Sequence, residues 1–321
     1  NAKRHGSVAV DTETTSLNAM TAKLVGVSLS IGGNKACYIP LDHISISEDA
    51  DGGLDLLGGS ADRPKQIPKA RALELLKPLL TDPSVLKIGQ NIKYDSVIFA
   101  QNGVSVTPID DTMLLSYVLE GGMHGHGMDE LAELHLDHTT IKFKEVAGTG
   151  KSQVTFDKVP LDKALDYAAE DALITYRLHA ALKPRLVPEK MVTVYETIER
   201  PLVKVLADME QRGIKADRPF LHRLSNNFAH RLVDLQAEIH EIAGEPFTIG
   251  SPKQLGEVLF EKMGIPGGKK GKSGSYSTGA DILEGLAADG HVLPTKVLEW
   301  RQLAKLKSTY TDALQEQINS K

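Results

Sequence analysis

The first stretch of the chain has the alternating pattern of β-strands. Residues 7–11 are a short apolar run, 24–31 alternate between apolar and polar positions, and 36–40 form a third run. The turn-like sequence Gly32-Gly33-Asn34 separates the last two runs. These segments predict two or three paired antiparallel strands.

Helical periodicity follows and then alternates with strand signals. A helix is predicted over 69–80, a buried strand over 85–88, and further helices over 92–102, 111–119, 128–136 and 161–182. Strands that alternate with helices predict an α/β domain with a mixed central sheet flanked by helices. Pro184 and Pro188 bracket the expected end of this domain, which we place at residues 1–187.

The rest of the chain, residues 188–321, predicts an all-α second domain. Long helical patterns cover 189–211 and 219–242, and the last helix is predicted over 294–317. Residues 264–279 are rich in Gly, Lys and Ser and predict a flexible connection. Residues 42–66, rich in Asp, Gly and Ser, predict a surface loop to which we assign no function.

Composition narrows the class of protein. The chain has 321 residues with 41% hydrophobic content, enough for one large or two ordinary domains. Its single cysteine, Cys37, excludes an internal disulfide and is interpreted as a small core residue, and the histidines show no zinc-ligand spacing. No secretory leader and no apolar run of roughly 18 residues occurs, so a cytoplasmic, non-membrane protein is expected. The start at Asn1 and the helix-like end suggest a piece of a larger protein.

Net charge is -5, and its distribution bears on nucleic-acid binding. From Ser251 onward there are ten Lys or Arg against eight Asp or Glu, so the acidic excess lies entirely upstream. Phosphate binding normally requires a basic surface. An acidic domain that handles DNA would therefore need metal ions as its positive charge.

Two carboxylates close the first predicted strand. In Asp11-Thr12-Glu13 the acidic side chains are two positions apart, and strand side chains alternate between faces, so both lie on one side of the sheet. That arrangement can bind a metal ion. Alone, such a pair is more typical of a solvated surface.

Two further acidic positions lie on helices. Tyr167 and Asp171 are four residues apart and therefore share a helix face, with Glu170 off that face and expected to be exposed. Asp95 falls in the first turn of the helix after strand 85–88. Taken alone, the first pair is better explained as a half-buried tyrosine beside a surface aspartate, and complementing the helix dipole explains Asp95.

The set as a whole resembles a known family. Asp11-Thr12-Glu13 with Leu17, the Gln90-Asn91 and Tyr94-Asp95 pairs, and Tyr167 with Asp171 resemble the three motifs of the DnaQ-like (DEDD) exonucleases, tyrosine-bearing subgroup. Residues 111–117, 140–151, 199–203, 211–213, 241–244, 251–255 and 303–312 extend the resemblance to bacterial family A DNA polymerases of the Klenow type. The resemblance implies a ribonuclease H-like fold followed by a polymerase thumb. Nothing resembling the palm or the fingers is present, so polymerase activity is not expected.

The resemblance also implies a chemistry. It makes Asp11, Glu13, Asp95 and Asp171 ligands of two divalent cations, Mg²⁺ or Mn²⁺, whose preferred ligands are hard oxygens. Asp11 would bridge both ions, Glu13 and Asp171 would hold one of them, and Asp95 would serve the other. Tyr167 would orient the attacking water together with Glu13. The expected activity is 3'-5' proofreading exonuclease cleavage that releases deoxynucleoside 5'-monophosphates.

The implied partner is DNA, bound by a monomer. A single-stranded 3' end would enter the exonuclease site, and duplex DNA would contact the thumb. Ordinary core packing explains Leu17 and Phe143 equally well, and a solvated helix face explains the basic positions. Two other functions stay open: a catalytically silent scaffold domain, and an RNA exonuclease of the same superfamily. The expected DNA contacts are Leu17, Gln90, Asn91, Tyr94, Phe143, Arg301 and Lys305.

Overall fold

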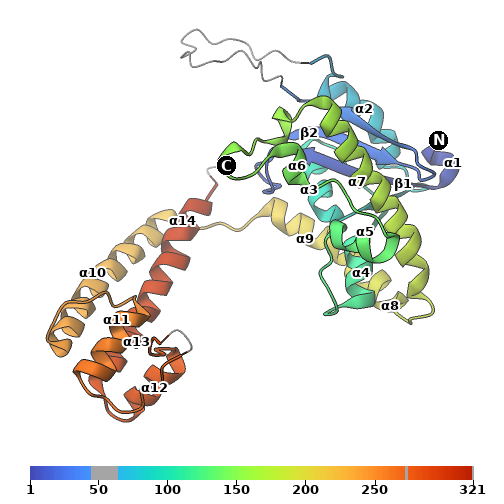
Figure 1. The fold of residues 1–321 in the computed structure, drawn as a ribbon. Coiled ribbons are helices and arrows are strands. Elements are labelled where there is room, and N and C mark those ends of the chain that lie inside the picture. Colours follow the sequence, from blue (N-terminus) through green and yellow to red (C-terminus); the bar gives the residue numbers. More distant parts are fainter. Residues whose placement is uncertain (45–63, 272–273, 320–321) are drawn as a thin grey trace, which may run out of the picture. The chain divides into compact units, whose positions relative to one another are not determined.

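The computed structural model describes residues 1–44, 64–271 and 274–319 (Figure 1). The chain forms two compact units, Asn1–Gly213 and Ile214–Lys321. Residues 188–213 therefore pack with the first unit, although the sequence predicts that the first domain ends at residue 187. Most of the loop expected at 42–66, and two residues of the connection at 264–279, lie outside the described residues.

A mixed sheet forms the centre of the first unit, as the sequence predicts, and it has five strands. Strands β1 (Ser7–Thr14), β2 (Leu24–Ser30) and β3 (Ala36–Pro40) are antiparallel, whereas β4 (Leu86–Gly89) and β5 (Ile109–Asp111) run parallel to β1. The strand order is β3-β2-β1-β4-β5. Strand β5 is not predicted by the sequence pattern, because three residues are too few to show a period.

Helices cover both faces of this sheet. On one face α7 (Leu161–Leu182) packs across β1, β2 and β3 (Figure 1). Ala164 and Ala168 of α7 pack there with Val25 and Tyr38. On the other face, apolar side chains of α2 and α3 pack against Val8 and Val10 of β1. Besides α7, the α-helices of this unit are α1 (Ala2–His5), α2 (Lys69–Leu80), α3 (Ile92–Gln101), α4 (Thr112–Glu120), α5 (Met128–Leu136), α6 (Phe143–Ala147), α8 (Val192–Val194) and α9 (Arg200–Arg212).

The second unit is helical. Its core includes Ile239, Leu255, Leu283 and Val297. Between residues 264 and 279, Lys270 and Tyr276 form an isolated β-bridge, so the described part of the expected flexible connection is a folded turn. The helices are α10 (Arg218–Ala243), α11 (Pro252–Gly256), α12 (Ala280–Ala288), α13 (Val292–Lys305) and α14 (Ala313–Gln317), with π-helical turns at Glu257–Lys262 and Leu306–Asp312.

One expectation about the core is wrong. Cys37 is exposed, whereas its neighbour Tyr38 is buried, because residues along the edge strand β3 alternate between faces. Across the described residues, no helix is both long and apolar enough to cross a membrane.

Residues beyond 187 contribute to the core of the first unit through Tyr195. Its ring is fully buried, and its hydroxyl accepts the backbone N–H of Asp111 at 2.9 Å and donates to Asp110 at 3.2 Å. Asp110 also binds His179 at 2.8 Å and Lys183 at 3.0 Å. This buried network ties the segment around Tyr195 to β5.

Tyr195→Phe should destabilise the first unit. The change removes only the hydroxyl, leaves the buried N–H of Asp111 without its acceptor, and should lower the free energy of unfolding by about 1–3 kcal/mol. Urea unfolding followed by far-UV circular dichroism and amide exchange at Asp111 measure the effect. Tyr117→Phe, at a half-exposed tyrosine, is the matched control. Equal stability of the two variants would contradict the role of this hydroxyl.

Candidate active site

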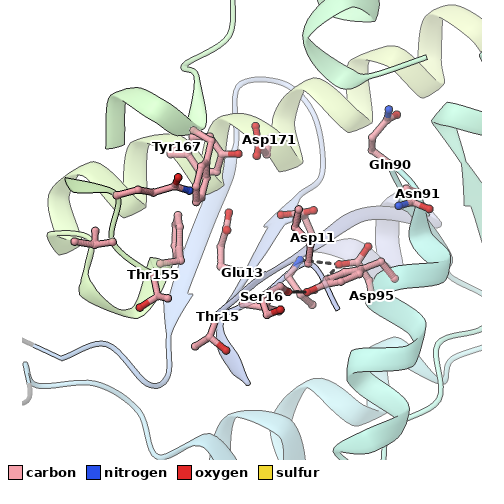
Figure 2. Close-up of a pocket in the computed structure, with 18 residues that line it drawn as sticks. Asp11, Glu13, Thr15, Ser16, Gln90, Asn91, Asp95, Thr155, Tyr167 and Asp171 are labelled. Carbon is pink, nitrogen blue, oxygen red and sulfur yellow. Dashed lines mark hydrogen bonds between the residues drawn. The ribbon is translucent and has the colours of Figure 1, made fainter. Parts of the chain in front are cut away.

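The end of β1 presents two carboxylates on one face of the sheet. Asp11 and Glu13 point toward α7 (Figure 2). Val8 and Val10 pack in the core on the opposite face of the sheet. The pairing register with β2 shifts between Glu13 and Thr14, so an irregularity in the strand follows the second carboxylate directly. Such irregularities are common beside active sites, where they redirect the chain.

Helix α7 brings a third carboxylate to the same place. Carboxyl oxygens of Asp11, Glu13 and Asp171 lie within 4.8 Å of one another, and Tyr167 lies one turn before Asp171 on the same helix face (Figure 2). The strand pair Asp11 and Glu13 and the helix pair Tyr167 and Asp171 therefore belong to one site.

Asp95 lies at the same cleft but outside this group of three. Its Oδ1 accepts hydrogen bonds from the backbone N–H of Thr12 at 2.9 Å and from the Thr12 hydroxyl at 2.5 Å. Thr12 lies between the two strand carboxylates and points to the other face of β1. It therefore fixes Asp95 against the end of β1, with one carboxyl oxygen held by Thr12.

Asp111 holds the start of α3. Its carboxylate accepts the N–H groups of Asn91 and Ile92, at 3.1 and 2.9 Å, and those of Met113 and Leu114, at 2.9 and 3.3 Å. One buried side chain thus caps two helices, α3 and α4. Because Asp95 lies in the first turn of α3, this cap also sets its position.

One cleft of about 830 Å³ collects these groups. None of the described residues that line it is basic, although four of them are carboxylates. All ten site residues expected in the first domain line it: Asp11, Glu13, Leu17, Gln90, Asn91, Tyr94, Asp95, Phe143, Tyr167 and Asp171. Eight further residues of the lining are not among the predicted site residues: Thr12, Thr14, Thr15, Ser16, Gln153, Val154, Thr155 and Phe156.

The electrostatics of the cleft favour bound cations. Burial raises the pKa of Asp11 to about 6, and burial together with the neighbouring carboxylates raises the pKa of Glu13, Asp95 and Asp171 well above its usual range. Glu13 Oε1 is buried and has no hydrogen-bond partner among the described residues. Convergent carboxylate oxygens with a free buried acceptor fit hard divalent cations such as Mg²⁺ or Mn²⁺.

The two apolar residues at the cleft differ in exposure. Leu17 is 98% exposed, which excludes core packing, and it stands at the rim of the cleft. Phe143 is 40% exposed and stacks on Phe156 with centroids 6.4 Å apart, so it is partly supported by the core. Tyr94 is held by hydrogen bonds of its hydroxyl with Thr14 and the carbonyl oxygen of Ser16.

Gln90 and Asn91 form the turn between β4 and α3. The carboxamide of Gln90 is engaged at both ends: Oε1 accepts from the Thr112 hydroxyl at 2.5 Å, and Nε2 donates to the carbonyl oxygen of His126 at 2.8 Å. Asn91 has a left-handed backbone, with φ of 57°, a conformation that asparagine tolerates better than most residues. Both side chains face the cleft from a rigid turn.

Glu170 was expected to be exposed, but the structure shows it partly buried. It accepts hydrogen bonds from the backbone N–H of Ile141 at 2.6 Å and from His138 at 2.8 Å. It thereby fixes the segment that leads to Phe143. The sequence carries no local signal for this contact, since the partners are about 30 residues apart.

In the second unit, the two basic residues have different surroundings. Arg301 donates to the carbonyl oxygen of Thr278 at 2.6 Å, so it braces the turn before α12. Lys305, one helical turn later, is exposed.

Comparisons with known proteins agree with this geometry. Residues 1–187 match the family model described as 3'-5' exonuclease, and residues 218–321 match the model described as DNA polymerase family A. DNA polymerase I of Rhizobium leguminosarum is 54% identical over 98% of this chain and 31% of its own length. DNA polymerase I of Pseudomonas aeruginosa is 41% identical over 97% of this chain and 33% of its own length. The chain thus spans about a third of these relatives.

A solved structure has the same fold. The POL domain of Pol1 from M. smegmatis, in complex with DNA primer-template and dNTP, aligns with a TM-score of 0.76 at 23% identity. The alignment covers 99% of this chain and 48% of that one. At this identity the likeness establishes the architecture alone.

Asp11→Asn should stabilise the metal-free chain at neutral pH. The pKa of Asp11 is about 6 in the fold against 3.8 ordinarily, so its charged form is disfavoured and stability falls as pH rises from about 4 through about 6. At pH 8 with chelator, the variant should therefore melt at least about 2 °C above the parent. Mg²⁺ should raise the melting temperature of the parent more than that of the variant.

The control is Asp166→Asn, at an exposed position on the same helix as Asp171. It should change neither the melting temperature at pH 8 nor the response to Mg²⁺. An Asp11→Asn chain that melts below the parent in chelator would show that the carboxylates do not repel one another in this cleft.

Proposed function

The chain belongs to the 3'-5' exonuclease family that accompanies family A DNA polymerases, and on that premise we propose that it is a proofreading exonuclease that hydrolyses 3' ends of DNA. The observation that carries the proposal is the convergence of three carboxylates within 4.8 Å, with Asp95 at the same cleft and no basic residue among its described lining. A phosphodiester is itself anionic. Such a cleft accepts it only together with divalent cations.

Two divalent cations, when bound, would supply the positive charge that stabilises the attacking and leaving oxygens of an in-line displacement. Asp11 would serve both ions because its charge interacts with Glu13 and Asp171 on one side and with Asp95 on the other. Glu13 and Asp171 would hold one ion. Asp95, held by Thr12, would serve the second.

Tyr167 would orient the attacking water together with Glu13. Burial, followed by the charges of Asp171 and Glu13, raises the pKa of the Tyr167 phenol far above its usual range, so it stays protonated at neutral pH. A protonated phenol donates a hydrogen bond but cannot act as a base. The role of Tyr167 is therefore to position the water, and the proton of the water would pass to one of the carboxylates of the cleft.

The rim residues support an unpaired strand as substrate. Leu17 and Phe143 offer apolar surfaces that can pack against bases regardless of their identity, and the lining hydroxyl and amide groups can meet the sugar and phosphate. Selectivity for mismatched ends would then arise because the 3' end must separate from its template strand to reach the cleft, and this separation costs less free energy at a mismatch. We propose duplex DNA as the partner of the second unit, with exposed Lys305 as one contact.

Asp171→Ala should abolish nucleotide release. Loss of one of the three closest carboxylates should lower the rate of deoxynucleoside monophosphate release from a mismatched primer-template by at least about 100-fold. Asp166→Ala, exposed on the same helix, should retain the parental rate. Chelator should stop release by the parent. Release that survives both Asp171→Ala and chelator would overturn the proposed mechanism. Equal rates of release from RNA and from DNA would overturn the proposal that DNA is the substrate.

Leu17→Ala should weaken positioning of the strand without affecting the fold. A side chain that is 98% exposed contributes little to stability, so unfolding should change by less than about 0.5 kcal/mol. KM for a single-stranded oligonucleotide should rise roughly fivefold or more, in line with the worth of one base contact. Leu75→Ala, at another exposed leucine on α2, should leave KM unchanged. An unchanged KM for Leu17→Ala would remove this residue from the substrate site.

A further inference from the structure

Three side chains meet at the junction of α4 and α5, outside the cleft. Glu120 is the last residue of α4, His124 lies in the following loop, and His135 is in the last turn of α5. Glu120 Oε2 lies 2.9 Å from His124 Nε2 and 3.0 Å from His135 Nε2. One ligand atom from each residue lies within 4.8 Å of the other two, and all three side chains are largely buried.

Hydrogen bonding around His124 leaves one ring nitrogen for a cation. Nδ1 contacts the carbonyl oxygen of Gly125 at 2.6 Å, which can only accept, so Nδ1 carries a proton. Nε2 faces the carboxylate of Glu120, which also only accepts. A second proton or a metal ion must therefore lie between Nε2 and Glu120. An imidazole with Nδ1–H on a carbonyl and Nε2 free is the usual arrangement of a metal ligand.

The spacing suits a small divalent ion. At bond lengths of about 2.0–2.1 Å, tetrahedral ligands lie about 3.3 Å apart, so the observed 2.9 and 3.0 Å require only a slight opening. Two imidazole nitrogens and one carboxylate oxygen form a donor set that Zn²⁺ prefers over Mg²⁺. We propose that Glu120, His124 and His135 bind a Zn²⁺ ion, with a fourth position left for water.

The surroundings orient and balance this cluster. Arg185 donates to the other oxygen of Glu120 at 2.6 Å, which fixes the carboxylate while leaving Oε2 toward the two histidines. Glu189 pairs with Arg185 at 2.7 Å and offsets its charge. Glu130 accepts the N–H of Gly125 at 3.2 Å and adds a negative charge beside the loop.

A bound ion would fasten the loop at 121–127 to both helices. The same loop reaches the exonuclease cleft, because the carbonyl oxygen of His126 accepts the Gln90 amide at 2.8 Å and His126 Nδ1 contacts the Ser116 hydroxyl at 2.8 Å. The site is thus structural, and it stabilises the support of one cleft residue. Glu120 and His124 lie four residues apart and the two histidines lie 11 apart across a helical junction, a combination that is not one of the zinc-binding patterns recognised from sequence.

Equilibrium dialysis of the full chain against Zn²⁺ tests the proposal. The Asp11→Asn background weakens the carboxylate site, and the retained zinc is measured by elemental analysis. About one Zn²⁺ per chain should be retained at micromolar free metal. His135→Gln should weaken binding by at least about tenfold. His138→Gln is the matched control, because His138 follows α5 closely but pairs with Glu170 instead.

Two outcomes overturn the proposal: no zinc retained in the Asp11→Asn background, or equal zinc affinity of His135→Gln and His138→Gln. If His135→Gln proves unstable, amide hydrogen exchange in the Asp11→Asn chain provides a second test that does not need this variant. In the Asp11→Asn chain, Zn²⁺ should slow amide exchange in residues 121–127 and leave α2 unchanged, and unchanged exchange in 121–127 would also overturn it. Neither measurement depends on nuclease activity, so the proofreading proposal can fail independently.

Discussion

Repulsion among four buried carboxylates is the constraint on which the first unit depends. Asp11 and Glu13 come from β1, Asp95 from α3 and Asp171 from α7, and no basic residue in the described lining offsets them. In water each charge is stabilised by solvent, whereas in this cleft burial raises every one of their pKa values. Holding these groups together therefore lowers the stability of the fold, and the divalent cations proposed for the cleft would offset that loss.

Residues that are not themselves ligands keep the carboxylates in place. Thr12 holds Asp95 with two hydrogen bonds, and Asp111 caps α3 and so sets the turn on which Asp95 lies. Glu170 secures the segment that carries Phe143. Because mutual repulsion would otherwise open the cleft, this supporting layer must be rigid before any cation binds. Backbone N–H groups supply most of these contacts, since they cannot compete for the cation.

Much of this arrangement could be predicted from the sequence, and the remainder could not for physical reasons. Period and spacing located α2, α5 and α7, and placed Asp11 beside Glu13 and Tyr167 beside Asp171. The convergence of the three segments was available only from the family resemblance, because tertiary contacts leave no local period. Glu170 and Cys37 were misjudged for the same reason: exposure depends on which distant segment covers a residue. The three-residue strand β5 was too short to register.

The two proposed cation sites differ in donor chemistry. The cleft offers only carboxylate oxygens at its centre, which suits ions that keep water and bind phosphate oxygens, whereas the α4–α5 junction offers two imidazoles and one carboxylate. Gln90 lines the cleft and contacts the α4–α5 region, because its carboxamide joins Thr112 of α4 to the carbonyl oxygen of His126 in the loop that follows His124. A Zn²⁺ ion bound by Glu120, His124 and His135 would therefore restrain the edge of the cleft through these two hydrogen bonds.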